Sequence, residues 1–190
     1  KIKDPKRKTS LIKILAHKFV NPNYKKVMTV DGSIKINCDI NNFLKIYNKN
    51  NDDFTTARHP QRRCLYEEAR EVFNLQFDHK ETLDNQINRY KSEGCPKDMG
   101  FYAACVIIRN NLSGDLNSFF DLWGEEYLKG SKRDQISLAY ALWKYNLNNS
   151  KPVKVSTFNF NEVYVKKQFL EKTIHLKSKR IKIKTHLKIK

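Results

Sequence analysis

Apolar residues recur along this chain with two different periods, and these periods predict where helices and strands form. A return every three or four positions, the spacing of one helix face, predicts helices over 9–19, 39–48, 64–75, 80–93, 113–130 and 131–147. The predicted caps are Thr9 or Ser10, Asp39 and Ser131. Short β-branched or continuously apolar runs predict strands over 27–30, 33–36, 54–58, 101–110 and 153–158. The stretch 101–110, FYAACVIIRN, is typical of a strand buried on both faces.

Strands that alternate with helices predict an α/β fold. We expect one domain over residues 1–165, with a mostly parallel central sheet flanked by helices. The remaining residues, 166–190, form a basic tail in which Ile and Lys alternate. This tail is predicted to be either an edge strand or a solvated extension.

The net charge of +17 is unevenly distributed. Residues 166–190 hold ten Lys or Arg and one acid, whereas residues 1–165 hold 27 basic and 19 acidic residues. The body is therefore moderately basic, as suits a protein with an anionic ligand. A nucleic-acid-binding protein is an alternative, but the aromatic residues fall on apolar helix faces and the charge gathers in the tail.

The remaining composition excludes several classes of protein. The four cysteines show no C-x-x-C spacing, so we expect reduced thiols rather than a zinc site or a disulfide framework. No apolar run approaches the roughly 18 residues of a membrane span. The start, KIKDPKRK, has no secretory signal and no methionine. A cytoplasmic location is favoured, and an earlier part of a longer protein is expected to precede this start.

Three polar clusters lie where strands end or helices begin. In the first, Asp31, Gly32 and Ser33 interrupt a strand-like stretch. Asp-Gly is a common hairpin dipeptide; the alternative is a ligand-binding carboxylate at the end of a buried strand. In the second cluster, ARHPQRRC, Arg58 and His59 follow a strand. Such side chains suit phosphate or hydroxyl groups, although a solvated basic loop has the same composition.

The third cluster, GSKRDQIS, places Arg133, Asp134 and Gln135 in the first turn of an amphipathic helix. An acid in a first turn stabilises the helix dipole by a few tenths of a kcal/mol. That effect does not explain why three polar side chains stand together, and they are free to converge on a small polyhydroxylated ligand. No nucleophile triad, P-loop, G-x-G-x-x-G or H-E-x-x-H motif is present.

These clusters belong to a series of blocks that carries a family resemblance. In chain order the blocks are KILAHK, DGSIKI, RHPQRRCLYEEA, QINRYKSEGCP, GFYAACVIIRNN and SKRDQISLAYALWK. The series resembles a glycosyltransferase-like family of plants, bacteria and large DNA viruses. The match runs from about Lys3 to Lys144, and its specific patterns are HPxRxCxYEEA and SKRDQxSxxYxLWK.

The resemblance implies a GT-A-type, Rossmann-like fold and transfer of a sugar from a nucleotide-sugar donor to a glycan or protein-linked acceptor. It also implies a Mn²⁺ or Mg²⁺ ion, with Asp31 as the first acid of an Asp-x-Asp element that holds the cation against the diphosphate. Position 33 is Ser rather than Asp, so the ion is either held more weakly or held by a further ligand, for which His175 is a candidate. The family's first strand should precede KIKDPKRK, so a catalytically impaired remnant is an alternative.

The same frame assigns roles to the other polar residues. Asp134 is expected at the reacting centre, either as a base or as a stabiliser of oxocarbenium charge. The side chains expected to meet phosphate are Lys13, His17 and Arg58. The side chains expected to contact sugar hydroxyls are His59, Arg133 and Gln135.

Overall fold

The computed structural model describes residues 2–36, 38–48, 52–110, 114–159 and 165–167. Its strands are β1 (Lys26–Val30), β2 (Ile34–Ile36), β3 (Phe54–Arg58), β4 (Tyr102–Asn110), β5 (Val155–Phe158) and β6 (Val165–Lys167). Its helices are α1 (Pro5–Ile14), the short 3₁₀ helix η1 (Ala16–Lys18), α2 (Ile40–Tyr47), α3 (Leu65–Asn74), α4 (Lys80–Ser92), α5 (Gly114–Lys129) and α6 (Asp134–Asn148). The predicted α/β class is confirmed.

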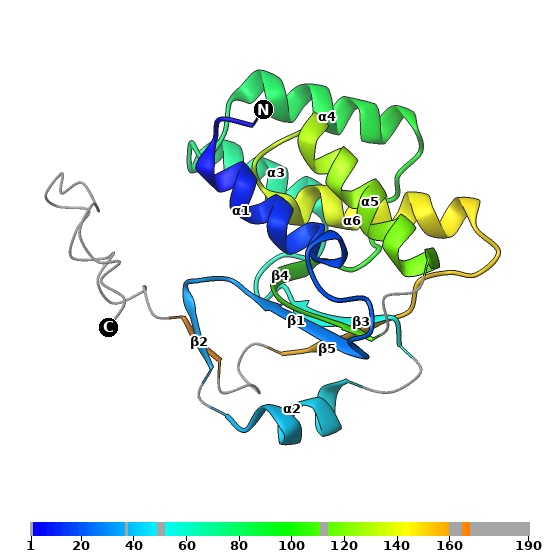
Figure 1. Ribbon diagram of the computed structural model, residues 1–190. Helices are drawn as coiled ribbons and strands as arrows, with labels where there is room; N and C mark the ends of the chain where they lie inside the picture. The colour runs from blue at the N-terminus through cyan, green and yellow to red at the C-terminus, as the bar shows by residue number, and fades with distance from the viewer. Residues whose placement is uncertain (1, 37, 49–51, 111–113, 160–164, 168–190) are drawn as a thin grey trace, which may run out of the picture.

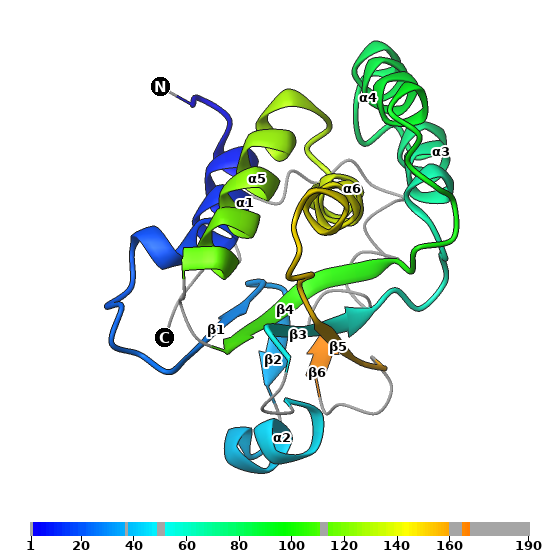
Figure 2. The ribbon, with the colours of Figure 1, turned by 90° about the vertical axis from the view of Figure 1, so that its right-hand side faces the viewer.

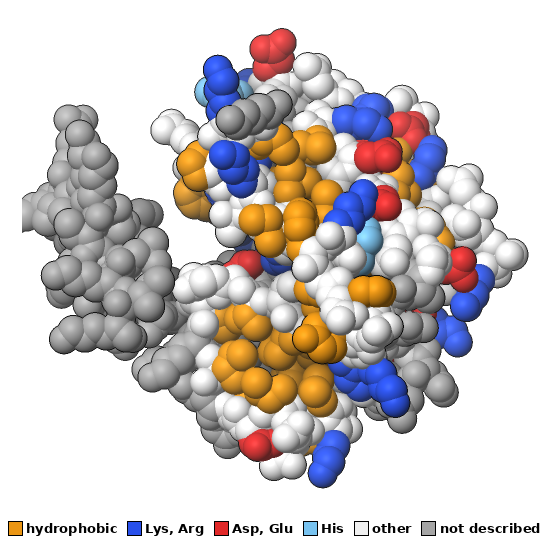
Figure 3. All heavy atoms as spheres, in the orientation of Figure 1, with side chains coloured by type: hydrophobic (Ala, Val, Ile, Leu, Met, Phe, Trp, Pro, Cys, Tyr) orange, Lys and Arg blue, Asp and Glu red, His pale blue; other side chains and the backbone are white. Residues whose placement is uncertain are grey.

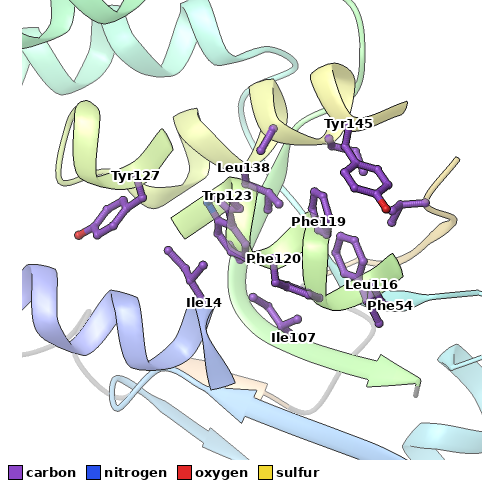
Figure 4. Close-up of a cluster of buried hydrophobic side chains, with 14 of the residues drawn as sticks. Ile14, Phe54, Ile107, Leu116, Phe119, Phe120, Trp123, Tyr127, Leu138 and Tyr145 are labelled. Atoms are coloured by element: carbon purple, nitrogen blue, oxygen red, sulfur yellow. The ribbon is translucent and has the colours of Figure 1, made fainter. Parts of the chain in front are cut away.

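Helices cover both faces of a four-stranded sheet (Figures 1 and 2). On one face α1, α5 and α6 pack against the sheet through a cluster that includes Phe54, Ile107 and Trp123 (Figure 4). On the other face Phe43 of α2 joins a second cluster that includes Val106 and Phe158. A third cluster joins α3 and α4 to α6. On the surface that Figure 3 shows, hydrophobic side chains gather in an upper and a lower group.

The sheet is mixed rather than mostly parallel, so that prediction is wrong. The strand order is β1-β4-β3-β5. β4 is antiparallel to β1 and β3, and β3 is parallel to β5. β1, β3 and β5 therefore run in the same direction and β4 alone is reversed. The carboxyl ends of β1 and β3 still meet at one edge of the sheet, and β4 begins at that edge.

Strand β4 carries an irregularity at this edge. Thr56 pairs with Ile107, but Arg58, only two residues later, pairs with Tyr102. Between these pairs Ala104 adopts a φ of +50°. This conformation is energetically unfavourable for any residue other than glycine. The chain therefore bulges at 103–105. This strained segment lies beside the site residues described below. β4 is buried along almost all of its length, as predicted.

Three local expectations differ from the structure: the start of the first helix, the hairpin alternative for Asp31-Gly32, and the burial of the first strand. Helix α1 begins at Pro5, not at Thr9, because Asp4 accepts hydrogen bonds from two backbone N–H groups of the first turn and Pro5 suits the first helical position. The Asp31-Gly32 hairpin does not form. Ile34 N donates to Asp31 O across a tight turn, but β1 pairs with β4 and β2 pairs with β6. Strand β1 is also an edge strand of its sheet, not a buried one.

Most of the predicted basic tail, including the candidate His175, lies outside the described residues. Helix α2 begins after its predicted cap, Asp39, which accepts a hydrogen bond from Asn42 N. All four cysteines are free thiols, as predicted. No helix within the described part of the chain is both long enough and apolar enough to cross a membrane.

Candidate functional site

Three of the predicted site residues meet at one ammonium group. Lys13 Nζ lies 2.9 Å from Asp31 Oδ1 and 2.5 Å from Asp134 Oδ2. The side chains of Lys13 and Asp134 are 10% and 12% exposed, whereas that of Asp31 is 39% exposed. The triad of Lys13, Asp31 and Asp134 is thus buried on the helix side and open to solvent at Asp31.

Helix α1 delivers Lys13 from its last turn, and charged groups fix both ends of this helix. At its C-terminus the buried Arg109 donates to the carbonyls of Lys13 and Ile14, at 2.6 and 2.9 Å. At its N-terminus Asp4 pairs with Lys132 at 2.8 Å. Burial lowers the pKa of Arg109 to about 9, and the negative end of the helix dipole favours a cation there.

The β4 bulge positions both carboxylates. Asp31 directly follows β1, and its backbone N–H donates to Cys105 O at 2.8 Å. Gln135, next to Asp134 in the first turn of α6, donates its Nε2 to Ala103 O at 2.8 Å. Both bonds end on residues 103–105, so the bulge brings the start of α6 and the end of β1 together. Gln135 Oε1 is buried and has no hydrogen-bond partner among the described residues.

Lys13 holds a permanent positive charge within the triad. Burial lowers the pKa of Lys13, but the carboxylates of Asp134 and Asp31 outweigh burial and raise this pKa well above its ordinary value. Two carboxylates surround this one ammonium group, and Asp31 is the more exposed of them. Such a surface suits hydroxyl groups and developing positive charge better than it suits a bare phosphate.

A second charged cluster contains Arg133, the residue that directly precedes Asp134 of the triad. The buried Glu68 accepts from Arg133 Nε at 2.6 Å and lies 3.1 Å from Arg62 Nε. His59 Nε2 is 3.9 Å from the same carboxylate. His59 Nδ1 accepts the backbone N–H of Arg62 at 3.0 Å, and His59 Nε2 lies 3.3 Å from Arg62 Nη1.

Sequence reasoning missed Glu68, although a signal was available. Glu68 shares the apolar face of α3 with Leu65, Ala69 and Val72, all of them buried. Charged residues are almost never fully buried unless they are paired. An acid at a core position of a helix therefore predicts cationic partners, and the Arg-rich segment 58–63 just before α3 supplies one of them.

The remaining predicted binding residues lie in different places. His17 is bound to Asp121 of α5 at 3.1 Å, and burial lowers its pKa while Asp121 partly opposes this shift. Arg58 is exposed at the carboxyl end of β3, where it donates to Thr157 Oγ1 at 3.4 Å. The structure thus brings Arg58 to the same sheet edge as Asp31, whereas the contacts of His17 lie on α5. The binding roles assigned to them stay predictions.

The donor set does not fit the divalent cation that the resemblance implies. Asp31 and Asp134 already share the Lys13 ammonium, and position 33 is a serine. Within the described residues no group of three or more His, Cys, Asp or Glu side chains could hold a metal ion. A metal ion between the two carboxylates would have to displace a buried ammonium of the same charge sign.

Comparisons with known proteins agree with the resemblance of the sequence blocks. A family model described as "TOD1/MUCI70, glycosyltransferase-like domain" matches residues 1–175. No curated protein and no solved structure gives a significant match. The family match includes the triad, the β4 bulge and the Glu68 cluster. The chain therefore belongs to the TOD1/MUCI70 glycosyltransferase-like family.

Proposed function

We propose that this domain transfers a sugar from a nucleotide-sugar donor to a hydroxyl group of a glycan or glycoprotein acceptor. The observation that carries the proposal is the meeting of Lys13, Asp31 and Asp134. These residues come from α1, the end of β1 and the start of α6, at the sheet edge where α/β proteins place their ligands. Membership of a glycosyltransferase-like family supports the same class of reaction.

Asp134 is the residue proposed at the reacting centre. In the transfer step the bond between the anomeric carbon and the diphosphate oxygen breaks, a bond to the acceptor oxygen forms, and the acceptor hydroxyl loses its proton. A carboxylate either accepts this proton or stabilises the positive charge that develops on the sugar. Lys13 orients the Asp134 carboxylate through their 2.5 Å contact.

Neighbouring groups complete the proposed donor site. Gln135 Oε1, buried without a partner among the described residues, can accept a sugar hydroxyl. The Asp31 carboxylate is exposed enough to accept another. The exposed Arg58 guanidinium, at the same sheet edge, suits the diphosphate because its planar fork matches phosphate oxygens.

Calorimetric titration with uridine, guanosine and thymidine diphosphates tests the donor site. We expect at least one of them to bind, and Arg58→Ala to weaken that binding by about 10- to 100-fold, the value of one charge-assisted hydrogen bond. The matched control is Arg70→Ala, because Arg70 is an exposed arginine on α3. Binding of none of the three would favour the impaired remnant. Equal losses in both variants would indicate general charge attraction and would reject the site.

A further inference from the structure

The strongest unexplained feature of the site is the ammonium group between its two carboxylates. We propose that Lys13 is the resident cation of this site and stands in place of a divalent metal ion. The inference rests on the proposed function for the identity of the site, but its test requires no sugar transfer. It predicts that the native site has no need of a metal and that removal of the ammonium creates a metal site.

The position of Lys13 supports a fixed cation rather than a mobile side chain. Its side chain is 10% exposed, and its Nζ contacts both carboxylates. The backbone carbonyl of Lys13 accepts a hydrogen bond from the buried Arg109. Displacing Lys13 would therefore separate two close ion pairs and leave the largely buried Asp134 carboxylate without its partner, which is costly.

The rest of helix α1 is held in the same way. Arg7 donates to the carbonyls of Tyr127 and Gly130, at 3.0 and 2.7 Å, and thereby joins α1 to the end of α5. With the Asp4–Lys132 pair and Arg109, this contact leaves α1 little freedom to withdraw. The ammonium position is thus built into the packing of the helices.

The chemistry of the donor set points the same way. Asp31 and Asp134 direct carboxylate oxygens at the same nitrogen atom, so a metal ion in its place could contact both once the side chains close to coordination distance. Hard divalent cations prefer carboxylate oxygens, so an Asp31–Asp134 pair without Lys13 is a suitable pair of ligands. With Lys13 present, an incoming metal ion meets a charge of its own sign.

Mn²⁺ titration followed by electron paramagnetic resonance of the free ion tests the proposal directly. The proteins are the full chain and its variants Asp31→Asn, Lys13→Met, Lys13→Arg and Lys13→Met with Asp31→Asn. Met has nearly the length of Lys but no charge, and Arg keeps the charge. We expect no saturable Mn²⁺ binding by the wild type or Lys13→Arg. Lys13→Met should bind one Mn²⁺ at least about tenfold more tightly than wild type, because the repulsive charge is gone. The added Asp31→Asn should abolish this gain.

Two results would overturn the proposal. One is saturable Mn²⁺ binding by the wild type that Asp31→Asn removes, because Lys13 would then not hold the cation position. The other is a folded Lys13→Met protein that binds no Mn²⁺, because the two carboxylates would then not form a cation site. Circular dichroism checks folding, and Lys13→Gln replaces Lys13→Met if the latter does not fold. The nucleoside diphosphate titration above reports separately on the proposed function, so the two failures are distinguishable.

Discussion

Replacing Glu68 by Gln should destabilise the fold more than any surface charge change on the same helix. The Glu68 side chain is 1% exposed and lies between Arg133, at 2.6 Å, and Arg62, at 3.1 Å. Gln keeps the shape of the side chain but removes its charge. The two guanidinium groups would then face a neutral amide in a buried setting.

The expected loss of stability in Glu68→Gln follows from the burial of the Glu68 side chain. Removing one partner of a buried ion pair costs about 3–5 kcal/mol. The side chains of Arg133 and Arg62 keep 30% and 18% exposure, and since water can partly solvate them again we expect about 2–3 kcal/mol of lost stability. For a chain of this length that corresponds to a melting temperature lower by about 5–10 °C.

Urea unfolding followed by tryptophan fluorescence measures this loss, because Trp123 is fully buried. The control is Glu71→Gln on the same helix. Glu71 is 39% exposed and 3.7 Å from Arg62, so its loss should cost less than about 1 kcal/mol. Equal losses in the two variants, or a loss below about 1 kcal/mol for Glu68→Gln, would refute the burial argument.

Two further predictions concern pH and packing. A hydrogen bond from Lys144 is the largest cause that lowers the pKa of Glu93 to about 2, from its ordinary 4.5. The stability due to Glu93 is therefore complete above about pH 4.5 and is lost as pH falls through about 2; acid titration of Glu93→Gln should lack this component, and an unchanged acid profile would contradict it. Gly130→Ala would place a Cβ 2.2 Å from Gln86 Nε2 and should cost about 1–3 kcal/mol in urea unfolding. Gly32→Ala, with no atom within 4 Å, should change stability by less than about 0.5 kcal/mol, and similar losses in both would contradict the packing argument.

The site was more accessible to sequence reasoning than the sheet was. Asp31 and Asp134 stand out in the sequence because one follows a strand and the other begins a helix, and the Lys13 contact joins them in the structure. The direction of β4 was not predictable from its apolar run. A central strand covered on both faces reads as continuously apolar whether it is parallel or antiparallel to its neighbours.

Ion pairs between residues far apart in the sequence could not be predicted either. No local pattern shows that His17 faces Asp121 or that Arg133 faces Glu68, because each pair forms only when separate helices pack together. The start of α1 is a different case. Asp4-Pro5 is a recognisable helix start. The first turn of α1 is polar, however, and the apolar periodicity used for the prediction begins only at Leu11.

The central claim is that the triad carries out sugar transfer, and donor turnover tests it most directly. The measurement is the release of nucleoside diphosphate from uridine-, guanosine- and thymidine-diphosphate sugars, by the wild type, Asp134→Asn and Asp84→Asn. Asp84 is a suitable control because it also pairs with a lysine, Lys80 of α4, and contacts no predicted site residue within the described part of the chain.

We predict release by the wild type with at least one donor, and activity of Asp84→Asn within about twofold of it, since that change touches no reacting group. Asp134→Asn should lose about 100-fold or more, the usual contribution of a general base. Its nucleotide affinity should stay close to that of the wild type. Turnover that Asp134→Asn leaves intact would contradict the account.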